Sequence, residues 1–299
     1  MVNYALQFAR VQSEDQADRW PQAIKADFTK RLDRNVEPSF EFSFTLGAYL
    51  TYLLYLDEVW LVDDIDRIFP KQDEYHWHVA FSGYLLYSRP LSESIYSLLK
   101  KHGHYQKALN SDFCNRQIDA SVLPETDVVY LDSQQIDLTV DRVVKEKLVS
   151  DICLGWMEEF EILEDESSLI YQLVNSENPN LLSVLIHFFW KKRDNLPEQL
   201  KTKVIPTWRA LYESLSQKDD VEKYGEVLSR LSGWVALVDK IDAEVLKWLK
   251  MSTQHIRGLT DSAFFVEELL PHATKTPAEV GDIYLGMLTH NVYPYHDQE

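Results

Sequence analysis

Hydrophobic positions recur along most of the chain at the three-to-four-residue spacing of amphipathic helices. In the first third, this pattern predicts helices over 20–34, 73–88 and 91–109, and two helices within 40–69 with a break near Asp63–Asp64. Beyond residue 137, it predicts helices over 138–163, 167–174, 181–193, 195–215, 220–238, 242–251, 259–273 and 277–288. The chain is therefore expected to be all-α.

Prolines and capping residues support several of these helices. Pro21 is suited to the first turn of the first helix. Pro206 is expected to kink its helix because it removes one backbone donor. The run Thr276-Pro277-Ala278-Glu279 combines an N-cap, a first-turn proline and a capping-box acid, so it predicts the start of the last helix.

One segment interrupts the helical rhythm. Residues 111–137 contain Pro124, several Asp and Ser residues and a short β-like run at 128–131. A connection of about 25 residues is long for a loop within a compact domain. We therefore expect an N-terminal helical sub-domain over 1–110, an irregular linker over 111–137 and helical hairpins over 138–299.

The helices of the second half follow a regular spacing. Pairs of helices begin near Asn178, Asp220 and Leu259, a period of about 40 residues, which is close to that of HEAT-type hairpins. The internal similarity between these units is mainly in aromatic residues: Trp190, Trp208, Trp234 and Trp248. The pattern predicts a HEAT- or TPR-like α-solenoid, with an ordinary non-repeating helical domain as the alternative.

Both ends of the sequence resemble the interior of such an array. Residues 293–297 have the composition of a turn between helices, and Asp297 is placed to cap a further helix. Tyr4, Leu6 and Phe8 form an apolar stripe without a preceding cap. Because solenoids usually end in polar caps, we expect that the natural chain continues, that this sequence is a fragment, or that another chain covers the end.

The amino-acid composition narrows the possible fold classes and the possible kinds of ligand. Glycine and proline number 9 and 11 in 299 residues, whereas average usage would give about 36 together. This shortage argues against barrels, sandwiches and loop-rich α/β enzymes. The net charge of −18 disfavours direct nucleic-acid binding. The longest basic run, 191–193, lies at the predicted end of a helix, where it complements the helix dipole.

The cysteines and the apolar runs indicate the cellular compartment in which the chain is expected to fold. Cys114 and Cys153 lack a CxxC spacing, which suits a reducing cytoplasm. Cys153 lies in an apolar helical context and is expected to be a buried structural thiol. The sequence has no signal-peptide pattern at its start. The longest apolar run, near 181–190, is about half a membrane span, so it predicts a buried helix and no membrane contact.

The common catalytic motifs are missing. The chain contains no GxxxxGK[ST], GxGxxG, GxSxG or HExxH sequence. The nearest candidate for a metal site is formed by His76, His78, His102 and His104, which could converge at helix ends. Histidines two residues apart point to different faces of a helix, so ordinary hydrogen bonding is the alternative.

Two acidic clusters are further candidates for chemistry. Asp63, Asp64 and Asp66 could hold a divalent cation, although such a run is more typical of a solvated helix face or a helix start. Glu158–Glu159 and Glu161 could perform acid–base work only if they faced a cleft. We therefore predict no catalytic, cofactor-binding or metal-binding residue, and no cofactor.

Several stretches resemble a bacterial protein region. They are DEVWLV at 57–62 leading to IFP at 68–70, WHVAFSGYL at 77–85, FFW at 188–190 and VIPTW at 204–208. Over about residues 45–290, the chain resembles the C-terminal helical region of large bacterial proteins that carry a sirtuin-like or STAND-type NTPase module, many of them in antiphage defence. The resemblance implies a sensor or scaffold solenoid joined to an effector. This chain lacks an effector module, and no functional residue carries over.

Three functions remain open at this point. The first is a non-catalytic α-solenoid that senses or scaffolds protein partners, such as an effector nuclease, an NTPase or an NAD-consuming module. The second is an all-helical enzyme with a site between its two halves. The third is an acidic inhibitor that mimics nucleic acid on a basic partner, with steep salt dependence. Aromatic residues make up 12% of the chain, and some could anchor a partner.

Overall fold

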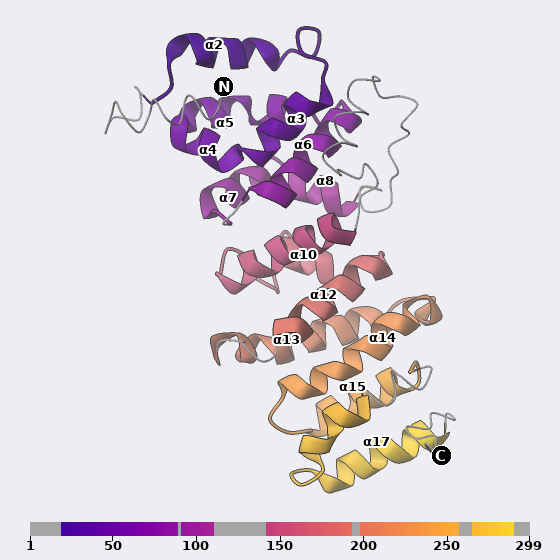
Figure 1. The fold of residues 1–299 in the computed structure, drawn as a ribbon. Helices are drawn as coiled ribbons and strands as arrows, with labels where there is room; N and C mark the ends of the chain where they lie inside the picture. Colours follow the sequence, from indigo (N-terminus) through magenta and orange to yellow (C-terminus); the bar gives the residue numbers. More distant parts are fainter. Residues whose placement is uncertain (1–18, 89–90, 111–141, 193–197, 257–264, 290–299) are drawn as a thin grey trace, which may run out of the picture. The chain divides into compact units, whose positions relative to one another are not determined.

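A computed structural model describes residues 19–88, 91–110, 142–192, 198–256 and 265–289 (Figure 1). Within these ranges every regular element is a helix, which confirms the predicted all-α class. Contacts divide the chain into two compact units, Met1–Phe160 and Glu161–Glu299. The predicted linker at 111–137, with its β-like run, lies outside the described residues.

The first unit contains α2 (Gln22–Arg31), α3 (Phe40–Ala48), α4 (Leu50–Leu56), α5 (Glu58–Ile68), α6 (Glu74–Tyr87), α7 (Glu93–Lys101), α8 (His104–Asn110) and α10 (Arg142–Met157). Side-chain caps define several starts. Ser39, Asp57 and Asp73 accept hydrogen bonds from the first-turn backbone of α3, α5 and α6. Each cap satisfies a donor that has no partner within its helix.

The region 40–69 forms three helices rather than the predicted two. Its breaks fall at Tyr49 and Asp57, and Asp63–Asp64 lie inside α5. Asp57 adopts an extended conformation with φ −162°, and its Oδ1 accepts the backbone N–H of Trp60 at 2.9 Å. The predicted break was misplaced because a single capping carboxylate, rather than the acidic run, ends one helix and starts the next.

Two residues with positive φ also shift predicted boundaries. Gly103, with φ 72°, separates α7 from α8 within the predicted helix over 91–109. Glu159, with φ 66°, ends α10 in a Schellman motif, in which Phe160 N donates to Gly155 O at 2.8 Å. The predicted helix over 138–163 therefore stops at Met157, before the acidic turn at 164–166.

Helices α3 and α6 of the first unit pack directly against each other (Figure 1). A Cβ at Gly47 would lie 1.8 Å from the carbonyl oxygen of Ala80, and a Cβ at Gly83 would lie 2.4 Å from that of Phe44. The two backbones therefore touch directly, and only glycine fits at both positions.

The second unit contains α11 (Leu169–Val174), α12 (Pro179–Lys192), α13 (Glu198–Ser216), α14 (Gly225–Leu231), α15 (Ala243–Thr253) and α17 (Pro277–Thr289), with 3₁₀ turns η5 (Val221–Tyr224), η6 (Ser232–Leu237) and η7 (Leu270–His272). Residues 265–269 are also helical. The continuous helix predicted over 220–238 is instead η5, α14 and η6 in series. Gly225 and Gly233 lower helix propensity near those junctions. α13 continues past Pro206.

Tryptophans form the centre of the second unit. The rings of Trp208 and Trp248 lie 5.4 Å apart, and those of Trp208 and Trp234 lie 6.3 Å apart. All three side chains are buried, and Trp234 Nε1 donates to the backbone oxygen of Ile186 at 3.1 Å. Trp190 is only half-buried on α12. Three of the four recurrent tryptophans therefore serve one shared core.

The predicted buried helix near 181–190 is confirmed. Leu181, Leu182 and Leu185 of α12 are fully buried. In the part of the chain that the structure describes, no helix is both long and apolar enough to cross a bilayer.

Candidate interaction surface

Helices α4 and α5 expose apolar side chains opposite their buried faces. Leu50, Leu53 and Leu56 of α4 are buried, as are Trp60, Leu61 and Ile65 of α5. The other faces carry four exposed apolar or aromatic residues: Tyr52 (48% exposed), Tyr55 (43%), Val59 (70%) and Val62 (39%). The helices pack against each other, and only three residues separate Tyr55 from Val59. We call these four residues the α4–α5 surface.

Neighbouring residues hold this surface in place. The guanidinium of Arg19 lies 4.4 Å above the Tyr55 ring, and its Nη1 donates to the Tyr55 carbonyl at 3.1 Å. Between the helices, Lys25 forms a salt bridge with Asp57. Partial burial opposes ionisation of Asp57, but hydrogen bonds from Lys25 and from the Trp60 N–H hold the pKa of this carboxyl below its usual value. The junction between the tyrosine and valine pairs is thus fixed by charge-assisted hydrogen bonds.

Two carboxylates border the valine end. Glu58 lies one helical turn before Val62, and Asp63 lies one turn after Val59. Both are exposed, and neither forms an ion pair with another described residue. The surface therefore combines exposed apolar groups with two uncompensated negative charges.

The structure brings two of the four candidate histidines together at Asp66. His102 Nδ1 lies 2.7 Å from Asp66 Oδ2, and His104 Nε2 lies 3.5 Å from Asp66 Oδ1. Trp77 Nε1 donates to His104 Nδ1 at 3.2 Å. These contacts connect α5 and α6 to the turn between α7 and α8.

His104 is the most strongly perturbed group of this cluster. Its side chain is completely buried. Burial, aided by the nearby positive charge of Lys71, lowers the pKa of His104 to about 3, although Asp66 opposes the shift. The imidazole is therefore neutral near pH 7, which suits its role as acceptor for the Trp77 indole.

The remaining candidate histidines have other partners. His76 Nδ1 and Ser43 Oγ share a hydrogen bond at 2.7 Å, and the His76 ring packs 4.5 Å from that of Phe40. His78 is buried on the same helix. Across the described ranges, no three His, Cys, Asp or Glu residues are grouped in a way that could hold a metal ion.

The three carboxylates of the acidic run on α5 have different surroundings. Asp63 is exposed, Asp64 pairs with Arg67 at 2.6 Å, and Asp66 pairs with His102. These contacts direct the carboxylates to separate partners. The arrangement is that of helix-surface ion pairing rather than of a shared cation cage.

The second acidic cluster is divided in a similar way. Glu158 and Glu159 are exposed. Glu161 is buried, and its Oε2 accepts the backbone N–H of Leu169 at 2.8 Å, at the start of α11. Its carboxylate thus stabilises a helix N-terminus.

Cys153 confirms the expected buried thiol. Its side chain is fully buried in α10, and burial raises the pKa of the thiol far above its usual value. The thiolate needed for nucleophilic chemistry is therefore scarce in the folded protein. Cys114 lies outside the described residues.

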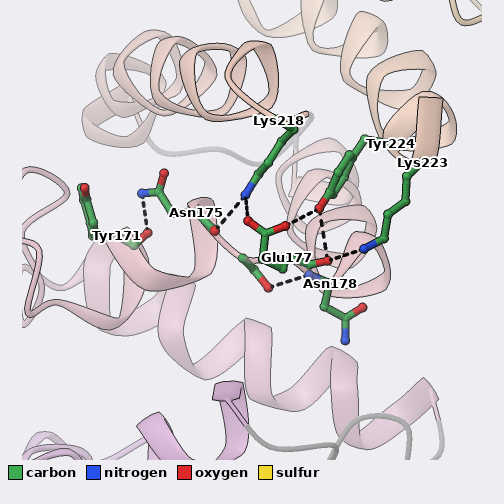
Figure 2. A network of polar contacts seen from close by, with 8 residues as sticks. Tyr171, Asn175, Glu177, Asn178, Lys218, Lys223 and Tyr224 are labelled. Atoms are coloured by element: carbon green, nitrogen blue, oxygen red, sulfur yellow. Dashed lines mark hydrogen bonds and ion pairs between the residues drawn. The ribbon is translucent and has the colours of Figure 1, made fainter. Parts of the chain in front are cut away.

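In the second unit, a polar clamp joins the turn between α11 and α12 to the connection between α13 and α14. Figure 2 shows Lys218 and Tyr224 converging on the Glu177 carboxylate; the Tyr224 hydroxyl donates to Oε2 at 2.9 Å. Lys223 donates to the Glu177 carbonyl at 3.3 Å. Hydrogen bonds from Lys218 and then Tyr224 lower the pKa of Glu177, while burial and the Glu177 carboxylate raise the pKa of Tyr224 to about 12. The clamp serves helix packing.

Sequence reasoning missed the α4–α5 surface because it did not separate the buried from the exposed apolar residues of 40–69. Apolar residues on both faces of a helix were the available signal, since a helix that packs on one side needs only one apolar stripe.

Comparisons with protein-family models, curated proteins and solved structures found no match to this chain.

Proposed function

We propose that this chain is a non-catalytic helical module that binds a protein partner as a sensor or scaffold. The observation that carries the proposal is the α4–α5 surface, where Tyr52, Tyr55, Val59 and Val62 are exposed on two helices that pack against each other. Exposed apolar groups on neighbouring helices can mark interaction sites. Tyrosine is among the residues that most often dominate binding energy at protein interfaces.

An α-solenoid architecture is part of this proposal. In the second unit, α12 packs against α14, α14 against α15, and α15 against α17, as expected for a linear array. Contacts between successive turns support it. Glu177 contacts Tyr224, which is 47 residues away, and the Lys275 ammonium donates to the carbonyl of Asp239, which is 36 residues away. Both separations are close to the period of about 40 residues in the sequence.

We further propose that the module works in the cytoplasm with an effector such as a nuclease, an NTPase or an NAD-consuming enzyme. The resemblance of 57–70 and 77–85 to helical regions of bacterial defence proteins supports this placement. The net charge of −18 favours a protein partner over nucleic acid.

Site-specific photo-crosslinking in the producing cells tests the proposal. A photoreactive phenylalanine analogue replaces Tyr52, and in a matched control it replaces Tyr284, which is similarly exposed on α17. We expect one discrete protein adduct at Tyr52 that disappears when Val59 and Val62 are both changed to serine. Equal adducts at both positions, or an adduct that survives the double change, would contradict the proposal.

A further inference from the structure

We infer that the α4–α5 surface receives a basic amphipathic helix of the partner protein. This inference rests on the proposed function and specifies the chemistry of the partner. It combines two independent features of the surface: the spacing of its apolar residues and the charge at one end.

The apolar spacing fits a helical ligand. Tyr52 and Tyr55 lie one turn apart on α4, and Val59 and Val62 lie one turn apart on α5. Leu53 of α4 and Trp60 of α5 are buried, so the exposed pair of each helix lies on another face of that helix. A row of apolar residues on an amphipathic helix, spaced by three and four residues, can contact both pairs in turn.

The unpaired negative charges of the surface lie at its valine end. The carboxylates of Asp57 and Asp66 are already compensated, by Lys25 and by His102 together with Lys71. Glu58 and Asp63 have no such partner in the described part of the chain. They are therefore the charges that a ligand can neutralise.

The tyrosine end of the α4–α5 surface carries a positive charge. Arg19 covers one face of the Tyr55 ring and brings a positive charge to that end. The surface thus selects a helix whose lysine or arginine residues lie near Val59 and Val62, while its apolar or acidic residues lie near Tyr55. Complementary charges of this kind set orientation and association rate more than total affinity.

Another exposed apolar pair provides a matched control. Tyr284 and Leu285 of α17 are 40% and 61% exposed. The neighbouring carboxylate of Asp282 is paired with Lys250. This pair therefore offers exposed apolar side chains beside a carboxylate that is already compensated.

The test uses a fluorescein-labelled amphipathic peptide of leucine and lysine, of about 18 residues and about five helical turns. A peptide of the same composition in scrambled order has the same charge without an apolar face. Fluorescence anisotropy measures the affinity of both for the full chain. We expect the amphipathic peptide to bind at least about tenfold more tightly than the scrambled one, because only its apolar face can cover the exposed valines and tyrosines.

Three variants locate the site. Changing Val59 and Val62 together to serine is expected to weaken binding about tenfold, since two exposed valines lose their apolar contact. Glu58→Gln with Asp63→Asn is expected to reduce the salt dependence of binding, because two carboxylates beside the exposed valines become neutral. Tyr284→Ser with Leu285→Ser is expected to change neither. Circular dichroism verifies folding, and the isosteric Glu58/Asp63 variant leaves the apolar packing intact.

Three outcomes would overturn the inference: equal binding of the two peptides, binding that is insensitive to both α4–α5 variants, or binding that arises only after deletion of residues 1–18. The last result would identify the chain's own N-terminal segment as the occupant. If the peptide fails while the Tyr52 crosslink still yields a Val59/Val62-dependent adduct, the proposed function stands and only the basic helix is rejected.

Discussion

Acidification is expected to destabilise the first unit through one buried histidine. His104 is fully buried, accepts the indole N–H of Trp77 and is neutral in the folded protein. The informative perturbation is a change from about pH 7.5 to about pH 5, applied to the native chain and to His104→Asn. The asparagine amide oxygen can still accept the Trp77 N–H, but it does not titrate.

The magnitude follows from proton linkage. The pKa of His104 falls from its ordinary value of 6.5 to about 3 on folding. Between these values the unfolded chain binds a proton that the folded chain does not, so stability is lost as pH falls below 6.5. At about pH 5 this loss is about 2 kcal/mol relative to pH 7.5, since each unit of pH in this window changes the free energy by about 1.4 kcal/mol.

The assay is urea unfolding at both pH values, with hydrogen exchange of peptides from α6 and α8 as the readout for the first unit. Subtracting the His104→Asn value removes the contributions of other titrating groups. The stability difference between the native chain and the variant should shift by about 2 kcal/mol in favour of the variant at the lower pH. A difference that is the same at both pH values would refute the assignment of His104 as a buried neutral histidine.

Three further predictions concern packing, the clamp and the thiol. Gly47→Ala should destabilise the protein by about 3 kcal/mol in thermal or urea unfolding, because the alanine Cβ would overlap the backbone of α6. Gly281→Ala in α17 is the control: an added Cβ there has no neighbouring atom within 4 Å, so this change should be neutral or slightly stabilising. Because folding lowers the pKa of Glu177, the clamp's contribution to stability is complete above the usual pKa of a glutamate and is lost as pH falls through the folded value. Glu177→Gln should remove this acid dependence, measured by hydrogen exchange of η5. An unchanged pH profile in the variant would argue against the clamp. In Cys114→Ser protein, Cys153 should react with a thiol reagent only after denaturant is added, and rapid reaction in buffer would show that it is accessible.

The sequence was sufficient to predict most helices but not the breaks between them. Hydrophobic periodicity identified the helices around 73–88 and 181–193 because it reports which face is buried. It did not locate Asp57, where one carboxylate caps the next helix, or Gly103, where positive φ reverses the chain. Such breaks depend on a single residue's backbone conformation, which a periodic pattern spanning both sides does not register.

The candidate chemistry illustrates the same limit. The sequence grouped His76, His78, His102 and His104 by spacing, but only His102 and His104 meet, at Asp66. Which histidines meet depends on the turn between α7 and α8 and on the crossing of α5, both set by tertiary packing. The structure shows that three of the four recurrent tryptophans, Trp208, Trp234 and Trp248, fill one core.

The most direct test of the proposed function is the affinity of the crosslinked partner, once identified, for three forms of the chain. These are the native chain, the Val59→Ser/Val62→Ser variant and the Tyr284→Ser/Leu285→Ser variant, compared by titration calorimetry at one salt concentration. The α4–α5 surface predicts binding about tenfold weaker or more for the valine variant alone, because burial of two exposed valines is lost. Equal affinities of the native chain and the valine variant would contradict the assignment of this surface as the docking site.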